Sequence, residues 1–167
     1  MPTTTELIKE LRERTSAGIM ECKRAIDEAK GDLTAAEKLL KEWGLATAAK
    51  KAGREASQGL IDSYIHAGRI GAMVEVNCET DFVARTDDFK QFAREVAMQV
   101  AATNPTRITA DEPSTNGSDG DADKPLLEQE YIRDSSKTIQ DLLNELIAKV
   151  RENVVIRRVA RFELGGG

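Results

Sequence analysis

The sequence has little of what most enzymes use for catalysis. Among its 167 residues there is one histidine, His66, and there are two cysteines, Cys22 and Cys78, with no Cys-x-x-Cys pair. A zinc site built from these residues would need carboxylates to complete it, so we interpret both cysteines as reduced core residues. Neither a Gly-x-x-x-x-Gly-Lys-Ser/Thr loop nor a Gly-x-Gly-x-x-Gly motif is present. The sequence therefore predicts no catalytic residue, no metal site and no bound cofactor.

Long apolar runs and an excess of positive charge are also missing. No stretch of about 18 apolar residues occurs, and the N-terminal segment lacks the basic-then-apolar pattern of a signal peptide. We therefore expect no membrane segment and a cytoplasmic location. Charged residues make up 32% of the chain and the net charge is -5, whereas a general nucleic-acid binder has a basic excess. We expect no direct contact with nucleic acid.

The N-terminal part of the chain is predicted to form a bundle of three short helices over residues 1–45. Apolar residues recur there at helical spacing in three successive stretches. Thr3 and Glu6 fit a capping box, Asp32 is a good N-cap for the third helix, and Gly44 is expected to end it. Aromatic residues are only 4% of the chain, so aliphatic side chains must form most of the core.

Residues 46–58 differ from this bundle in composition, since they are rich in alanine, lysine and arginine. We interpret them as a partly helical connector with solvated charges. From residue 59 the apolar period changes to two, which predicts an antiparallel hairpin with its turn at Ala67 and Gly68. The second strand of this hairpin carries alternating apolar residues from Ile70 to Cys78, so one of its faces is expected to be buried.

The rest of the chain is predicted to complete an α+β core domain over residues 59–167. A helix capped by Thr86 and a second helix ending near Val150 carry apolar stripes at helical spacing. A third strand from Val154 should join the hairpin, giving a three-stranded antiparallel sheet packed with helices. Residues 106–124 include an acidic stretch too poor in apolar residues to offset ordering, and we predict a mobile surface loop there.

Two short segments stand out as candidate sites. Thr80-Asp81-Phe82-Val83 places a bulky aromatic residue directly between a strand and a helix, a position that often carries function. Pattern alone favours Phe82 as a plug of the core over an exposed functional residue. Gly18-Ile19-Met20 places two large apolar residues after a helix break, where they either pack inside or form a groove for a partner helix.

These same segments carry a resemblance to a known family. Residues 11–23, LRERTSAGIMECK, resemble the opening signature of elongation factor Ts, and residues 75–84, EVNCETDFVA, resemble its second signature. The end of the chain, residues 157–163 (RRVARFE), is similar to the closing strand of that family. The resemblance covers nearly the whole chain except the acidic loop.

The resemblance implies a non-enzymatic guanine-nucleotide exchange factor for the translational GTPase elongation factor Tu. It implies that the N-terminal bundle has a fold similar to a ubiquitin-associated (UBA-like) domain and docks on the GTPase domain. Arg12, Ile19 and Met20 match the docking positions. Asp81 and Phe82, flanked by Thr80 and Val83, match the segment that reaches the nucleotide site and disturbs Mg²⁺ and phosphate binding there. GDP and Mg²⁺ are then ligands of the partner.

The resemblance also implies a homodimer, because the chain is similar to short members with a single core module. Two other classes of function remain open. A UBA-like binding adaptor with a dimerisation core would bind its partner without changing nucleotide release. A small hydrolase that used His66 or Cys22 would lose activity when either residue is replaced.

Overall fold

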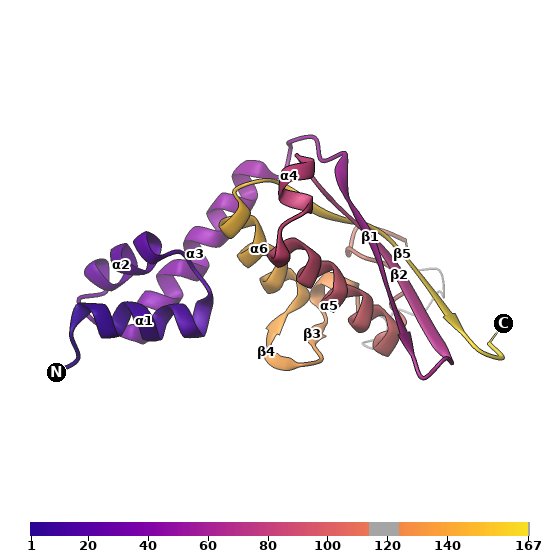
Figure 1. The fold of residues 1–167 in the computed structure, drawn as a ribbon, viewed down its shortest axis with the longest axis horizontal. Coiled ribbons are helices and arrows are strands. Elements are labelled where there is room, and N and C mark those ends of the chain that lie inside the picture. The colour runs from indigo at the N-terminus through magenta and orange to yellow at the C-terminus, as the bar shows by residue number, and fades with distance from the viewer. Residues whose placement is uncertain (114–123, 167) are drawn as a thin grey trace.

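The computed structural model describes residues 1–113 and 124–166. It shows an N-terminal three-helix bundle followed by an α+β unit that lies beside it (Figure 1). The predicted α+β class is confirmed. The elements run in the order α1 (Thr4–Thr15), α2 (Ile19–Glu28), α3 (Leu33–Lys51), β1 (Gln58–His66), β2 (Ile70–Cys78), α4 (Asp81–Ala84), α5 (Asp87–Thr103), η2 (Leu126–Glu128), β3 (Glu130–Tyr131), β4 (Asp134–Thr138), α6 (Ile139–Val150) and β5 (Val154–Glu163).

The bundle of α1, α2 and α3 begins with the predicted caps. Thr3 and Glu6 form a reciprocal capping box at the start of α1. The Asp32 side chain accepts a hydrogen bond from the Ala35 amide at 3.0 Å and caps α3. The buried residues of the bundle form an apolar cluster of their own, made of Leu11, Cys22, Ala25, Ile26 and Ala36.

Helix α3 continues past Gly44, so the prediction that Gly44 ends it is wrong. Gly44 is buried where α3 meets α6, and a Cβ there would lie 3.7 Å from the Ala148 Cβ. The residues that follow are mostly alanine and lysine, which are strong helix formers, so the helix extends to Lys51. As a result a single helix runs from the bundle into the α+β unit (Figure 1).

The sheet has the order β1-β2-β5 and is antiparallel throughout, as predicted. The inner face of the central strand β2 is buried, and the apolar stripe of α5 packs against it. The main core cluster therefore lies between the sheet and helices α5 and α6. Its fully or almost fully buried members include Val74, Val76, Cys78, Phe89, Ala93, Val96, Ala97, Val100 and Ile139.

A bulge in β5 sets which face the end of that strand presents. Glu75 pairs with Arg158 but Val76 pairs with Ile156, so Arg157 is an extra residue between them. An extra residue exchanges the two faces of a strand. Val154 and Ile156 consequently face the core before the bulge, and Val159 packs against the core after it. Phe162, on the other face of the strand, points outward at 79% exposure.

Gly59 is the position in the sheet where a side chain is least tolerated. Its φ is +147°, and a Cβ there would lie 2.0 Å from the Val76 carbonyl oxygen. We expect Gly59→Ala to lower the free energy of unfolding by about 2–5 kcal/mol, from backbone strain and overpacking together. Urea denaturation measures this difference. The control is Gly68→Ala in the hairpin turn, where φ is +66° but nothing lies within 4 Å, so only the backbone cost of about 1 kcal/mol is expected. Equal losses in both variants would contradict the steric argument.

A second small hairpin, β3–β4, was not predicted. Its strands are short and polar, so they carry no apolar alternation. The fully buried Gln99 of α5 holds the hairpin: its amide nitrogen donates to the Glu130 carbonyl oxygen at 3.0 Å, and its amide oxygen accepts from the Ile132 amide at 3.0 Å. The predicted mobile loop over residues 106–124 falls mainly on residues 114–123, which lie outside the described residues. In the described part of that range, Ile108 is buried in the core, so the predicted loop does not begin as early as residue 106.

Candidate functional site

The short helix α4 presents Phe82 to solvent. Thr80 caps it, because the Thr80 hydroxyl accepts a hydrogen bond from the Val83 amide at 3.3 Å. Val83 and Ala84 are buried and anchor the helix on the core, whereas Phe82 points away and is 81% exposed. The prediction from pattern alone, that Phe82 plugs the core, is therefore wrong.

The other residues of this segment divide between surface and interior. The Asp81 carboxylate is exposed and pairs with Arg85 at 3.0 Å along the same helix turn. Thr80 is exposed at the surface but uses its polar atoms to cap the helix. Partner contact by Val83 stays a prediction, since its side chain lies in the core cluster.

Cys78 supports the segment from below the surface. Its thiol donates to the Thr80 carbonyl oxygen at 3.0 Å. Burial, and then the negative charge of Glu152, raise the pKa of the Cys78 thiol to about 11, so the thiol stays protonated at neutral pH and keeps this donor. A protonated buried thiol is a poor nucleophile, which suits a structural role.

The second candidate segment lies at the start of α2. Ile19 is 54% exposed and Met20 is 73% exposed, so both are available to a partner. Cys22, Ala25 and Ile26 form the buried face of α2, whereas Ile19 and Met20 lie in its first turn, before that face begins, and are exposed. Of the two alternatives that the sequence left open, packing of both side chains inside is wrong, and their contact with a partner stays a prediction.

Arg12 lies beside these apolar residues. Its guanidinium nitrogen donates to the Ala17 carbonyl oxygen at 3.4 Å, which holds the side chain across the loop between α1 and α2. Arg12 and Ile19, together with Ile8 and Lys149, line an open hollow of about 770 Å³. This hollow brings positive charges and apolar side chains together, and arginine is enriched in protein interfaces.

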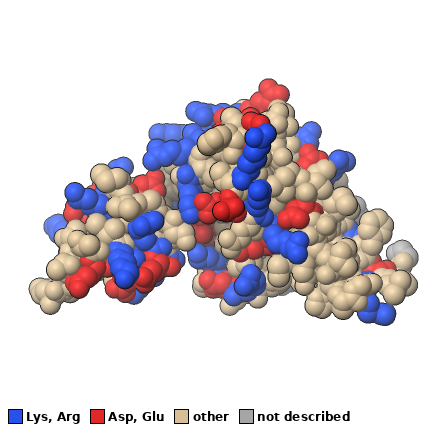
Figure 2. Space-filling view, in the orientation of Figure 1, with Lys and Arg blue, Asp and Glu red and all other residues tan. Residues whose placement is uncertain are grey.

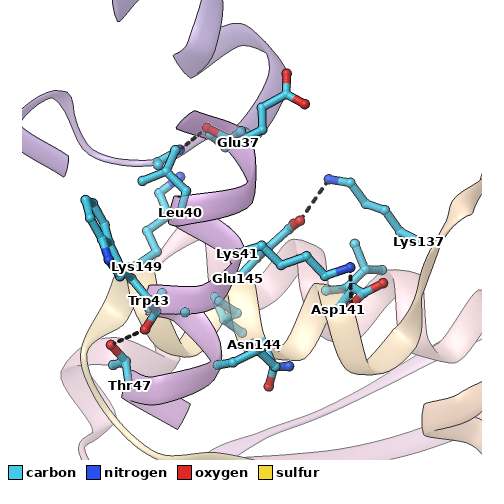
Figure 3. Close-up of a pocket in the computed structure, with 18 of the residues that line it drawn as sticks. Glu37, Leu40, Lys41, Trp43, Thr47, Lys137, Asp141, Asn144, Glu145 and Lys149 are labelled. Carbon is cyan, nitrogen blue, oxygen red and sulfur yellow. Dashed lines mark hydrogen bonds and ion pairs between the residues drawn. The ribbon is translucent and has the colours of Figure 1, made fainter. Parts of the chain in front are cut away.

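A second hollow, of about 510 Å³, lies between α3 on one side and α5 and α6 on the other. Figure 3 shows the side chains of α3 and α6 that line it. Ion pairs cross it or border it, including Lys41–Asp141 at 3.6 Å and Lys137–Glu145 at 2.9 Å. These charged side chains are paired with one another, and apolar side chains such as Leu40, Trp43 and Leu142 line the rest of the hollow.

The outer face of the sheet is unusually apolar for an exposed surface. Gly71 lies in the central strand near the hairpin turn, paired with Ile65, whose Cδ1 would lie 2.9 Å from a Cβ at that glycine. An ion pair between Glu75 and Arg158 at 2.8 Å borders the apolar part. The exposed apolar side chains that define the outer sheet face are Ile61 (59%), Ile65 (64%), Met73 (54%) and Phe162 (79%).

The residues suited to hydrolysis or metal binding are scattered. Nδ1 of His66 lies 3.0 Å from the Tyr64 hydroxyl oxygen in β1, and Cys22 is buried in the bundle, where burial raises the pKa of its thiol. Among residues 1–113 and 124–166, no three His, Cys, Asp or Glu side chains group as metal ligands. The helices of that described part include none with the length and apolarity to cross a membrane. Charges of both signs are interspersed over the visible surface (Figure 2).

The comparisons with known proteins converge on one family. The family model described as Elongation factor TS matches residues 46–117 and 79–167. The elongation factor Ts of Thermoanaerobacter sp. (strain X514) is 50% identical over 195 residues, which cover 98% of this chain and 96% of that protein. The elongation factor Ts of Caldanaerobacter subterraneus subsp. tengcongensis is 49% identical with 98% of each chain covered. That of Syntrophobacter fumaroxidans is 45% identical, covering 97% of this chain and 96% of that protein.

Proposed function

Because the chain belongs to the elongation factor Ts family, we propose that it is the guanine-nucleotide exchange factor of elongation factor Tu and promotes GDP release during polypeptide elongation. It then acts in the cytoplasm, binds the GTPase domain and catalyses no chemical reaction of its own. The observation that carries the proposal is the exposure of Phe82, at 81%, on a helix whose other apolar residues are anchored in the core.

Exchange requires only differential binding. The factor must bind the nucleotide-free GTPase more tightly than the GDP-bound form, and by linkage it then weakens GDP binding by the same ratio. In this proposal the surface around Arg12, Ile19 and Met20 docks the bundle on the GTPase domain. Phe82 and Asp81 reach the nucleotide site and disturb the surroundings of Mg²⁺, which is the largest local charge there. The ion and the nucleotide stay ligands of the partner.

The direct test is release of a fluorescent GDP analogue from elongation factor Tu, followed by stopped-flow with the purified chain as the added factor. We expect the release rate to rise with factor concentration and to saturate. Binding of the chain without any acceleration would favour the adaptor alternative and overturn the proposal.

Truncation of Met20 is expected to weaken docking rather than the release step. Its side chain is 73% exposed, so removing it leaves the bundle core intact while deleting apolar contact with the partner. We expect Met20→Ala to raise the concentration for half-maximal exchange about 5–30-fold, as a loss of about 1–2 kcal/mol predicts, with the maximal rate preserved. The control is Ile132→Ala, a comparably apolar residue that is 48% exposed in the β3–β4 turn. A lower maximal rate at unchanged half-saturation would contradict the docking role.

The same proposal includes a homodimer formed through the outer sheet face. Contiguous exposed apolar surface of this kind marks an interaction site. All three strands, β1, β2 and β5, contribute to this surface. Two copies related by a twofold axis would therefore pack sheet against sheet, with the same residues of each copy in the interface. Each copy would leave α4 and the bundle outside the interface, so the dimer would bind two GTPase molecules.

A further inference from the structure

The loop after α6 turns back onto the segment that carries Phe82. Helix α6 ends at Val150, and Arg151 adopts a left-handed conformation with φ +59° while its amide donates to the Ile147 carbonyl oxygen at 2.9 Å. This reversal brings the next two residues, Glu152 and Asn153, against residues 79 and 80.

Glu152 holds Thr80 with both carboxylate oxygens. The Thr80 amide donates to Oε1 at 3.0 Å, and the Thr80 hydroxyl donates to Oε2 at 2.8 Å. The two residues are 72 positions apart in the chain. Hydrogen bonds to an ionised carboxylate are stronger than neutral ones, and this pair fixes Thr80 at two points.

The contact with Glu152 holds the Thr80 hydroxyl at the position from which its oxygen caps α4. A hydroxyl has one proton to donate, and here that proton goes to Glu152. The hydroxyl oxygen, fixed in place by this bond, accepts from the Val83 amide at 3.3 Å, which is the cap of the helix. A helix of four residues is too short to be stable alone, so its geometry depends on such contacts.

Asn153 extends the same contact toward the bundle. Its amide donates to Glu79 Oε1 at 2.7 Å, and its side-chain nitrogen donates to the Arg54 carbonyl oxygen at 2.8 Å. Arg54 follows the C-terminal end of α3, the helix that runs from the bundle. The loop thus joins the helix that comes from the docking surface to the residue that caps the Phe82 helix.

We propose that Glu152 is a positioning residue for nucleotide exchange, which sets the Thr80 cap and thereby the direction of the Phe82 ring. The inference rests on the exchange function proposed above. Glu152 is half-buried behind α4 and acts through Thr80 rather than by touching the nucleotide or its metal.

The test is a set of variants measured in the GDP-release assay with the full chain. We expect Glu152→Ala to lower the maximal release rate about tenfold, with the half-saturating concentration changed less than about threefold, because docking by the bundle is untouched. Glu152→Gln keeps one oxygen acceptor, so its maximal release rate should lie between those of the unmodified chain and Glu152→Ala. Glu128→Ala, an exposed glutamate in η2, is the control and should behave as the unmodified chain. Amide hydrogen exchange at Thr80 and Val83 should be faster in Glu152→Ala than in this control.

A double-mutant cycle separates positioning from general destabilisation. If Glu152 acts through the ring, Glu152→Ala should have little further effect on the release rate in a Phe82→Ala background. Equal fold-changes in both backgrounds, an unchanged maximal rate in Glu152→Ala, or unchanged amide exchange at Thr80 would each overturn the inference. An unmodified chain that fails to accelerate release overturns the proposed function instead, and the amide-exchange comparison still tests the contact between Glu152 and Thr80.

Discussion

Replacing Phe82 by alanine should lower the maximal rate of GDP release about 10–100-fold while leaving the chain folded. The ring is 81% exposed in the free protein, so little internal packing is lost when it is removed. Burying such a ring in a partner contributes about 1.5–3 kcal/mol, and each 1.4 kcal/mol of lost transition-state stabilisation is about tenfold in rate. Stopped-flow release of fluorescent GDP at saturating factor measures the effect directly.

The Phe82 experiment needs a matched comparison. Ile132→Ala removes an exposed apolar side chain far from α4 in sequence and should leave the release rate unchanged. Phe82→Leu keeps part of the apolar bulk and should retain an intermediate rate. The half-saturating concentration should change little in Phe82→Ala, because the docking surface of the bundle is intact. A release rate equal to that of the unmodified chain would contradict the role of the Phe82 ring in GDP release.

Placing a carboxylate at Met73 should convert the proposed homodimer into monomers. Met73 lies in the central strand of the outer sheet face, paired with Ser63 in β1 and Ala160 in β5. The exposed side chains of Ile61, Ile65 and Phe162 lie diagonally across from it on the same face. Burying an unpaired charge there costs several kcal/mol, so we expect Met73→Asp to raise the dimer dissociation constant more than about 100-fold. Sedimentation velocity over a concentration series measures the change in oligomeric state.

A substitution of the same kind away from the sheet serves as the control. Ser135→Asp introduces the same charge at an exposed position of β4 and should leave the dimer intact. A monomeric unmodified chain would contradict the homodimer itself. A dimer that survives Met73→Asp would show that the outer sheet face is not the interface.

The fold was predictable where a single face of an element is buried. The stripe that begins at Phe89 in α5 and the alternation from Ala72 to Cys78 in β2 gave the correct elements, because in both cases spacing alone identifies the core side. The prediction that Gly44 ends α3 was wrong because this glycine allows close contact with α6, and a sequence does not show such a contact. The bulge at Arg157 was likewise invisible, since it depends on the register with β2.

The candidate site was predictable in part. Apolar residues next to a glycine break identified Ile19 and Met20, and the position of Phe82 between a strand and a helix identified the ring. Local pattern left the exposure of each residue open, because burial depends on what packs above it. Glu152 carried no local signal at all. Its partner is 72 residues away, and only the folded chain brings the two together.

The continuity of α3 bears on the entropy of complex formation. With a flexible linker between the bundle and the α+β unit, the α4 segment would still move relative to the partner after the bundle had docked. Binding of that segment would then cost the conformational entropy of the linker. Because α3 is an unbroken helix that packs on α6, most of this entropy is already lost when the protein folds. Spacing along it is counted in helical turns, so one inserted residue near Leu45 would rotate everything beyond it by about 100°.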